Sequence, residues 1–560
     1  MKSKFLRLRS GFFSIFLLLE IFAFSQSSNT RYWIAFKDKS GSPFSTASPQ
    51  QYLSPRSIAR RAHHNFITSA QDFPPNPSYV QQVSATGAEV LYRLKWFNGV
   101  VVRITNPAQL TAINALSFVL SSKSVARIAV ERSHESTPLL PTEVKSNAST
   151  NRTMSNRFNY GAALNQINLL NGTCLHNMFY DGRGMEIAEL DDGFLNSNIN
   201  APLDSLRQRN GILFKKNIYT GDTTSLYSIG GHGSSVLSCM AANQSGSMVG
   251  TAPYANFYLL RTEIDSCEQI LEEYDWVAGM EFADSAGADV VTSSLGYNIF
   301  DDPTQSHTWA SLNGRTSVAS LSATYGARRG LLVCVAAGNE GQATWRKITI
   351  PSDADSILAV GAVDATGIYA SFSSQGYSAD HRVKPDVASQ GLNSTIMDAN
   401  SGSITTSSGT SFATPILAGL AACLWQANPT KTNMQIIQAI KQSASQFATP
   451  DSFLGYGIPN FCNANQLLGG PNGTQIYVAS SIAGNQLTII VPNNTQADLT
   501  LEFFDITGRM ILSDPAKISA NNGSKQSIYL PDLSSLPPGM YIVRITSSNG
   551  DQWVKKIMRG

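Results

Sequence analysis

The sequence carries little charge, and the charge it has is balanced. Only 14% of its 560 residues are Asp, Glu, Lys or Arg, and the formal net charge at pH 7 is +2. Nucleic-acid-binding domains usually carry a basic stripe, and charged interaction tails carry blocks of one sign. Neither feature occurs here, so nucleic-acid binding has no support. The length indicates two to four domains.

Cysteine is also scarce, with six residues in the chain. That number does not make a disulfide framework of the kind that holds small secreted domains, and the spacing suits no zinc site. Three cysteines fall in apolar stretches and are expected to be small buried side chains: Cys239, Cys334 and Cys423. The other three lie in less regular segments, where a disulfide is compatible with the sequence but its pairing stays open: Cys174, Cys267 and Cys462.

Long apolar runs are missing except near the N-terminus. Basic residues there precede an apolar run over 12–24 that only Glu20 interrupts, and Ala23 and Ser25 then occupy the two positions that a signal peptidase reads. A membrane anchor, the alternative, needs about 20 uninterrupted apolar residues. We therefore expect residues 1–25 to be a signal peptide, cleaved before Gln26, and no transmembrane segment elsewhere.

The most informative feature that is present is a serine framed by small residues. Residues 409–415 read Gly-Thr-Ser-Phe-Ala-Thr-Pro and open an apolar, helix-like stretch over 416–425. Ser411 would stand at the start of a buried helix, where backbone N–H groups attract negative charge. A nucleophile that must stabilise an oxyanion needs this placement. A lone serine there is usually an N-cap, so the chemical interpretation needs a base and an acid upstream.

Both groups occur upstream of Ser411. Residues 187–194 read as a strand that runs into a tight turn, with Asp191 at the strand end. Residues 230–236 place His232 between glycines, just before an apolar helix over 236–242. The order Asp191, His232, Ser411 is the order found in subtilisin and differs from that of chymotrypsin and the α/β-hydrolases.

A fourth feature, the apolar run over 331–341 that turns at Asn339, completes a resemblance to the subtilisin-like serine peptidases. The resemblance covers about residues 155–468 and includes further matching stretches at 250–253, 293–297, 359–363, 370–374 and 384–387. It implies an α/β fold, a parallel sheet with helices on both faces. It also implies a secreted serine endopeptidase with Asp191, His232 and Ser411 as its triad, and with Asn339 and the Ser411 N–H as oxyanion donors.

Two positions depart from the family pattern. Asp192 follows the catalytic aspartate where the family usually has Thr or Ser, and Ser234 stands where the family usually has Thr. Adjacent strand-end residues point to opposite faces, so we expect Asp192 to face away from Asp191. Neither departure removes a catalytic group, and an active enzyme is expected. The alternative is a catalytically silent subtilisin-like surface protein that serves adhesion or binding.

The resemblance also places the substrate, which would pair as an added strand between two segments. The residues expected to bind it there are Ser294, Leu295, Gly296, Ala336 and Gly338. Thr349 falls where broad-specificity relatives often have glycine at the pocket floor, which would favour Leu, Met or Ala over Phe and Tyr at P1. Glu340, near the rim, would admit a basic P1 residue. The chemistry requires no cofactor, and structural calcium is compatible with the family but has no assignable ligands in this sequence.

An N-terminal region precedes the expected peptidase domain at 157–468. Residues 26–132 show strand-like runs at 31–36, 97–104 and 125–130 and a helical run at 110–120. In position and pattern they resemble the α+β inhibitory propeptide of the family. A permanent accessory domain is the alternative. Residues 133–156 are polar, as a cleavable linker should be.

A C-terminal region follows the peptidase domain. Short alternating runs such as 499–504 and 541–545 predict a β-sandwich over 471–560. The region resembles the sorting domain of the Bacteroidetes type IX secretion system in three features: a Gly-Arg turn at 508–509, a strand after Leu536 and a basic end at 555–556. A carbohydrate- or surface-binding sandwich is the alternative. We expect a monomer, exported across both membranes to the cell surface or beyond, whose partners are protein or peptide substrates and the secretion machinery.

Overall fold

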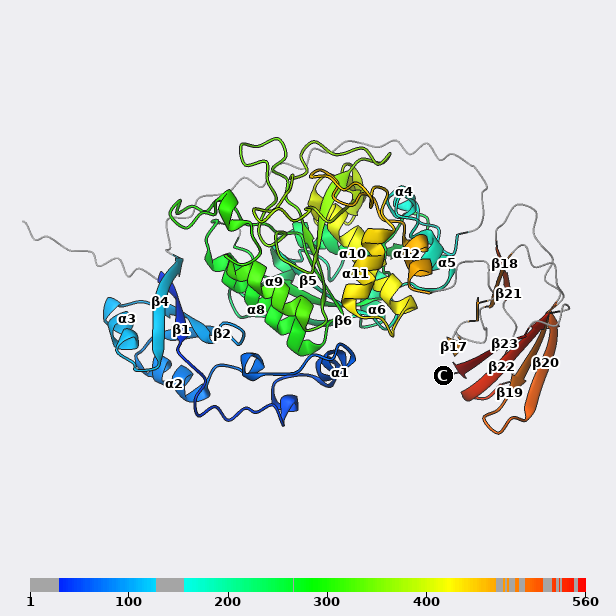
Figure 1. Cartoon of the computed structure of the whole chain (residues 1–560), viewed down its shortest axis with the longest axis horizontal. Helices are drawn as coiled ribbons and strands as arrows, with labels where there is room; N and C mark the ends of the chain where they lie inside the picture. Colours follow the sequence, from blue (N-terminus) through cyan, green and yellow to red (C-terminus); the bar gives the residue numbers. More distant parts are fainter. Residues whose placement is uncertain are drawn as a thin grey trace, which may run out of the picture.

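The computed structural model describes residues 30–126, 156–264 and 266–469, and segments of the C-terminal region between 477 and 559. The expected signal peptide and nearly all of the expected linker lie outside the described residues. An N-terminal α+β unit, a central α/β domain and an all-β C-terminal region follow one another along the chain (Figure 1).

The N-terminal unit is a four-stranded antiparallel sheet with the strand order β2-β3-β1-β4. Its elements are β1 Thr30–Phe36, α1 Pro55–His63, α2 Pro77–Ala85, β2 Glu89–Leu94, β3 Gly99–Ile104, α3 Pro107–Asn114 and β4 Val119–Ala126. One face of the sheet belongs to a core of its own that contains Ile34 and Val100. The opposite face, with Trp33 and Val101, packs into the core of the central domain.

The two strands predicted at 31–36 and 97–104 correspond to β1 and β3, but the predicted helix at 110–120 is displaced. The helix α3 ends at Asn114, and the chain is already extended from Val119. A capping box explains why the helix starts earlier than predicted. Gln109 Oε1 accepts the backbone N–H of Asn106, and Asn106 Oδ1 accepts the backbone N–H of Ala108. The predicted closing strand at 125–130 overlaps only the end of β4, and residues 127–130 lie outside the described part.

The central domain is built on a seven-stranded sheet with the order β13-β12-β11-β10-β5-β9-β6, and all neighbouring strands are parallel. The strands are β5 Glu186–Asp191, β6 Ile212–Asn217, β9 Asn256–Arg261, β10 Val290–Ser293, β11 Leu332–Ala336, β12 Leu358–Val363 and β13 Val387–Gln390. The inner strands β10, β11 and β12 are buried along their whole length, as expected for a sheet that is covered on both faces.

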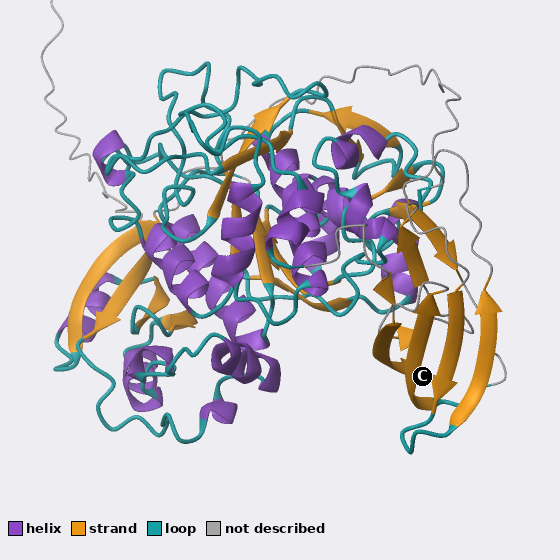
Figure 2. Ribbon diagram, turned by 45° about the vertical axis from the view of Figure 1, so that its right-hand side comes forward, coloured by secondary structure: helices purple, strands orange, loops and turns teal. Residues whose placement is uncertain are grey.

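Helices cover both faces of this sheet, as the sequence predicted (Figure 2). They are α4 Leu164–Asn168, α5 Thr173–Asn177, α6 Asp204–Gln208, α7 His232–Ala241, α8 Leu271–Ala286, α9 Val318–Arg328, α10 Thr410–Ala427, α11 Asn433–Gln442 and α12 Phe461–Leu467. The core that contains α7 and α10 includes Ile187 of β5, whereas the core that contains α8 and α9 includes the next residue, Ala188. Two short hairpins, β7 Asn243–Gln244 with β8 Met248–Val249 and β14 Ser394–Met397 with β15 Ile404–Ser407, complete the domain.

The helix α10 is apolar because it is buried on all sides. Among the residues that the structure describes, it is the one helix whose length and composition would suit a membrane span, and 89% of it is buried inside the domain. A core helix of this kind passes the same test as a membrane helix, so α10 is no evidence for a transmembrane segment.

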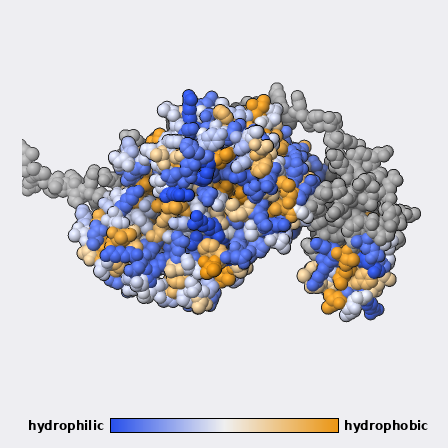
Figure 3. Space-filling view, in the orientation of Figure 1, coloured by the Kyte–Doolittle hydropathy of each residue, from blue (hydrophilic) through white to orange (hydrophobic). Residues whose placement is uncertain are grey.

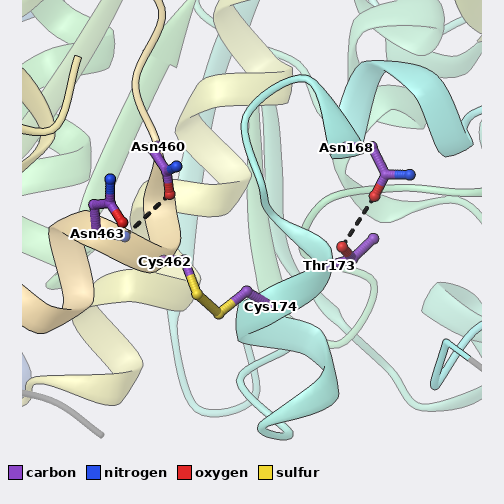
Figure 4. The surroundings of a disulfide bond; sticks show 6 residues. All are labelled: Asn168, Thr173, Cys174, Asn460, Cys462 and Asn463. Carbon is purple, nitrogen blue, oxygen red and sulfur yellow. Dashed lines mark hydrogen bonds between the residues drawn. A yellow bond between two sulfur atoms is a disulfide. The ribbon is translucent and has the colours of Figure 1, made fainter. Parts of the chain in front are cut away.

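A disulfide joins Cys174 on α5 to Cys462 on α12, across a sequence separation of 288 residues (Figure 4). It ties the beginning of the central domain to its last helix. Cys267, the third candidate for a disulfide, is a free and partly exposed thiol. The other three cysteines are free and buried, as the sequence predicted.

The described segments of the C-terminal region are all β, as predicted. They contain a five-stranded sheet of order β17-β23-β22-β19-β20 and a three-stranded sheet of order β16-β18-β21. The strands are β16 Tyr477–Val478, β17 Ser481–Ile482, β18 Ile489–Pro492, β19 Leu499–Phe504, β20 Met510–Ala516, β21 Gln526–Tyr529, β22 Gly539–Ser547 and β23 Gln552–Arg559.

On the visible face of the central domain, hydrophobic residues are scattered among hydrophilic ones (Figure 3).

Candidate active site

The predicted functional side chains meet at the carboxyl edge of the parallel sheet. Asp191 is the last residue of β5, which hydrogen-bonds to β9 on one side and to β10 on the other. His232 is the first residue of α7, so this helix starts earlier than the predicted residue 236. Ser411 is the second residue of α10. The ring centroids of His232 and Phe412 lie 5.8 Å apart, which places the two helix starts side by side.

Asp191 and His232 form a hydrogen-bonded pair. His232 Nδ1 donates to Asp191 Oδ1 over 2.7 Å, and the backbone N–H of Asp192 donates to the same oxygen over 2.8 Å. Asp191 is fully buried, whereas 33% of the His232 side chain is exposed. Burial lowers the pKa of His232, but the charge and hydrogen bond of Asp191 outweigh this and, with Asp192 and Glu263, raise that pKa to about 9.

Ser411 is hydrogen-bonded to the other side of the site. Its hydroxyl donates to the carbonyl oxygen of Ser294 over 3.3 Å, and the Ser294 hydroxyl donates to the carbonyl oxygen of Ser411 over 2.8 Å. Within the described part of the chain, no hydrogen bond joins Ser411 to His232. A serine hydroxyl changes partner by rotation about one side-chain bond, and catalytic hydrogen bonds often form only when substrate is present.

Asn339 lies in the turn that follows β11, next to the start of α10. Its Oδ1 accepts the backbone N–H of Thr410 over 2.9 Å and the Thr410 hydroxyl over 3.0 Å. A Cβ added to Gly409 would lie 3.6 Å from both Asn339 Nδ2 and the backbone nitrogen of Ser411. Asn339 Nδ2 and the backbone nitrogen of Ser411 thus lie near the same point, while the Asn339 side-chain oxygen is occupied by Thr410.

The residues predicted to bind substrate lie at the ends of β10 and β11. Ser294 and Ala336 are buried, Leu295, Gly338 and Glu340 are partly exposed, and Gly296 is exposed. Glu340 donates its backbone N–H to Ser374 Oγ over 3.0 Å, and burial raises the pKa of its carboxyl above the usual value.

Thr349 fills the space between the two expected substrate-binding segments. A Cβ added to Gly296 would lie 2.1 Å from Thr349 Oγ1, and one added to Gly338 would lie 2.8 Å from the same atom. Thr349 is only 4% exposed, and its N–H donates to the carbonyl of Ala337 over 3.0 Å. The Thr349 side chain thus lies against both Gly296 and Gly338, and its role as the floor of a P1 pocket stays a prediction.

The expectation that Asp192 faces away from Asp191 is wrong. Asp192 Oδ1 accepts the backbone N–H of Gly233 over 3.0 Å, and its carboxylate lies within 4.8 Å of ligand atoms of both Asp191 and His232. Alternation between faces holds only inside a strand, and β5 ends at Asp191. The chain turns sharply at Gly193, where a Cβ would lie 2.2 Å from the carbonyl oxygen of Ile229.

The same three side chains are the one group, among the described residues, that is close enough to share a metal ion. The His232 Nδ1 and Asp191 Oδ1 atoms are already joined by a hydrogen bond. The arrangement therefore fits an acid–base pair better than a metal centre. Structural calcium has no assigned ligands.

Sequence reasoning missed one unusual residue near the site, Glu189. It is fully buried on β5, two positions before Asp191, and neither carboxylate oxygen has a hydrogen-bond partner. Burial, together with Asp191 and Asp192, raises the pKa of Glu189 well above its usual value. A glutamate between the apolar residues Ala188 and Leu190 of a predicted strand was the available signal.

The fold and the site define a serine hydrolase built on a parallel α/β sheet. The profile of the Subtilase family matches residues 182–457. Subtilisin E of Bacillus subtilis is 30% identical over 303 residues, which cover 54% of this chain and 70% of that relative. Subtilisin of Bacillus pumilus is 30% identical over 303 residues, 98% of its length, and Subtilisin Savinase of Lederbergia lenta is 31% identical over 288 residues, 92% of its length. The chain belongs to the subtilase family and is a serine-type endopeptidase.

Two further matches describe the flanking regions. The profile of the Peptidase S8 propeptide domain of Bacteroidota matches residues 31–138, and that of a secretion system C-terminal sorting domain matches residues 483–559. The chain therefore combines a subtilase propeptide, a peptidase domain and a type IX sorting domain. It is a secreted or cell-surface protease.

Proposed function

We propose that Asp191, His232 and Ser411 form the catalytic triad of this endopeptidase. His232 Nε2 takes the hydroxyl proton of Ser411 while Ser411 Oγ attacks the peptide carbonyl carbon. The same proton then passes to the leaving amine as the C–N bond breaks and an acyl-enzyme forms. Water then attacks the ester carbonyl while His232 Nε2 takes one of its protons, and His232 returns that proton to Ser411 Oγ as the acyl–oxygen bond breaks. Asp191 holds the imidazole through Nδ1 and stabilises its cation.

The oxyanion of each tetrahedral intermediate is bound by Asn339 Nδ2 and the N–H of Ser411. This assignment is supported by the Asn339 hydrogen bonds to Thr410, which fix the orientation of the amide. Losing one such donor costs about 10²–10³ in kcat, a magnitude measured in subtilisin. We accordingly expect Asn339→Ala to reduce kcat by about that factor and to leave the KM nearly unchanged.

The observation that carries the proposal is the 2.7 Å hydrogen bond between His232 Nδ1 and the buried Asp191. In the neutral imidazole, this bond keeps the proton on Nδ1, which leaves Nε2 without a proton and therefore able to accept one. The substrate would lie as an added strand between the ends of β10 and β11, with its P1 side chain directed toward Thr349.

In the alternative of a catalytically silent surface protein, no base would activate Ser411, and its hydroxyl would keep donating to Ser294 and not to His232. A fluorophosphonate probe separates the two functions, because it phosphonylates only a serine that a base activates. We expect the mature secreted protein to be labelled at Ser411, and Ser411→Ala and His232→Ala to stay unlabelled. A folded wild-type protein that resists the probe after removal of the propeptide would support the silent alternative.

A further inference from the structure

The helix that carries His232 lacks an N-cap side chain of its own. The helix α7 begins at His232, and its N-cap residue, Gly231, offers no side-chain acceptor. The first N–H groups of a helix need partners from outside the helix. One of them, the N–H of Gly233, is accepted by Asp192 Oδ1 over 3.0 Å. A carboxylate from the turn after β5 thus caps α7 and lies favourably at the positive end of the helix dipole.

This cap acts directly on the geometry of the Asp191–His232 pair. Asp191 binds the His232 ring, while the next residue, Asp192, binds the helix backbone one residue beyond His232. The turn and the helix start are in close contact, because a Cβ on Gly233 would lie 2.2 Å from the carbonyl oxygen of Gly193 and 2.9 Å from Asp191 Cβ. Two adjacent residues therefore hold the side chain of His232 and the backbone N–H of the next residue, Gly233.

We propose that Asp192 is a positioning residue of the triad, which caps α7, fixes His232 against Asp191 and places a second negative charge beside the imidazole. The proposal rests on the function proposed above. Family members usually have Thr or Ser at this position, and either can accept a hydrogen bond but carries no charge. The chain would thus have a charged acceptor at a position where the family usually has a neutral hydroxyl, which adds an electrostatic effect on the base.

The charged groups around His232 determine the sign of that effect. Asp191 and Asp192 face the imidazole from the end of β5, and Glu263 acts on it from the segment after β9. Glu189 is buried on β5 two residues before Asp191, and Arg261, at the end of β9, donates Nε to the carbonyl oxygen of Asp192. Burial raises the pKa of both Glu189 and Glu263 well above the usual value.

The negative charges nearest to His232 therefore favour its protonated form. A general base must be neutral in the free enzyme, so the acid limb of kcat/KM follows the pKa of His232. Burial lowers that pKa, while Asp191 first and Asp192 after it raise it. Removing the charge of Asp192 should shift the acid limb to lower pH, and removing its oxygen as well should loosen the position of the imidazole.

Two substitutions separate the charge from the hydrogen bond. Asp192→Asn keeps an oxygen acceptor for Gly233 but has no charge, whereas Asp192→Ala lacks both. We expect both variants to move the acid limb of kcat/KM to lower pH by about half a unit or more. Only Asp192→Ala should also lower the plateau kcat, by about tenfold or more, with the KM unchanged. Asp355→Asn, which removes an exposed charge shortly before the start of β12, at the opposite edge of the sheet, is the matched control.

A measurement without turnover keeps the test independent of the proposed function. In the Ser411→Ala background, the Nδ1–H proton resonance of His232 can be titrated by NMR, once in the parent protein and once in a protein that also carries Asp192→Asn. We expect a lower midpoint with Asp192→Asn than in the parent, and no shift with Asp355→Asn.

Three results would overturn the proposal: an unchanged midpoint, an unchanged acid limb, or a wild-type plateau kcat in folded Asp192→Ala. A wild type that hydrolyses no peptide would instead contradict the triad assignment, and the NMR midpoints would then decide the role of Asp192 on their own.

Discussion

Asp284 on α8 of the peptidase domain and Arg61 on α1 of the propeptide form a 2.6 Å ion pair, and neither side chain is more than 2% exposed. Arg60 and Lys95 of the propeptide bind the same carboxylate over 2.7 and 2.6 Å. Burial alone would raise the pKa of Asp284, but these three cations hold it well below its usual value. One buried carboxylate of the peptidase domain thus binds three cations of the propeptide.

We predict that Asp284→Ala strongly destabilises the precursor, because it leaves three cations buried without this counter-ion. Breaking a buried ion pair costs about 3–5 kcal/mol in the free energy of unfolding. The measurement is denaturant unfolding of the Ser411→Ala precursor, which cannot process itself. Glu89→Ala breaks the exposed pair with Arg103 and should cost less than about 1 kcal/mol. Equal effects of the two substitutions would show that the buried cluster does not hold the domains together.

The same cluster predicts how precursor stability depends on pH. The pKa of Asp284 is lowered in the folded precursor, so its contribution is present above the unfolded pKa of about 4 and is lost as pH falls through the lower folded value. The difference in stability between the parent and Asp284→Asn should therefore be constant from about pH 5 to 8 and shrink below about pH 4. A difference that grows on acidification would have the wrong sign for this ion cluster.

The Cys174–Cys462 disulfide should stabilise the mature enzyme without taking part in its chemistry. It closes a loop that contains the whole catalytic edge of the sheet, and removing a native disulfide costs about 2–5 kcal/mol. We expect the double variant Cys174→Ser, Cys462→Ser to have a lower Tm and an unchanged kcat/KM at room temperature. Cys267→Ser, at the free and partly exposed cysteine, is the control and should leave the Tm unchanged.

Thr349 should set the depth of the P1 pocket. Because its hydroxyl lies against both Gly296 and Gly338, its removal opens space between the two substrate-binding segments. Burying a large apolar side chain there is worth about 1.5–3 kcal/mol, so Thr349→Gly should raise kcat/KM for P1 Phe relative to P1 Leu by about tenfold or more. Thr349→Ser, which removes only a methyl group, should have a smaller effect. An unchanged Leu/Phe ratio in Thr349→Gly would exclude Thr349 from the pocket.

The sorting domain should be needed for export and dispensable for catalysis. Every predicted catalytic group lies before α12, and the profile of the sorting domain begins only at residue 483. We expect a chain that ends at residue 470 to be retained in the periplasm of its native host. After removal of the propeptide, the purified truncated enzyme should keep its kcat/KM. Normal release of the truncated chain would contradict the sorting role.

Much of the site could be predicted from the sequence because its residues lie in short contiguous motifs. Asp191, His232, Ser411 and Asn339 each stand at the end or start of one element, and a parallel sheet brings such ends to one edge. The orientation of Asp192 could not be predicted, because it depends on where β5 ends and on how the next turn meets α7. The Asp284 cluster joins segments 189 to 224 residues apart, and no local pattern marks such contacts.

The central claim is that Ser411 is the nucleophile of an Asp191–His232–Ser411 triad. Peptide hydrolysis by the purified wild type and by the Ser411→Ala variant tests it most directly. Both proteins should be supplied without the propeptide and shown to have the same circular dichroism. We predict a loss of about 10⁴-fold or more in kcat for Ser411→Ala, with folding unchanged. Hydrolysis by Ser411→Ala at the wild-type rate would contradict the account.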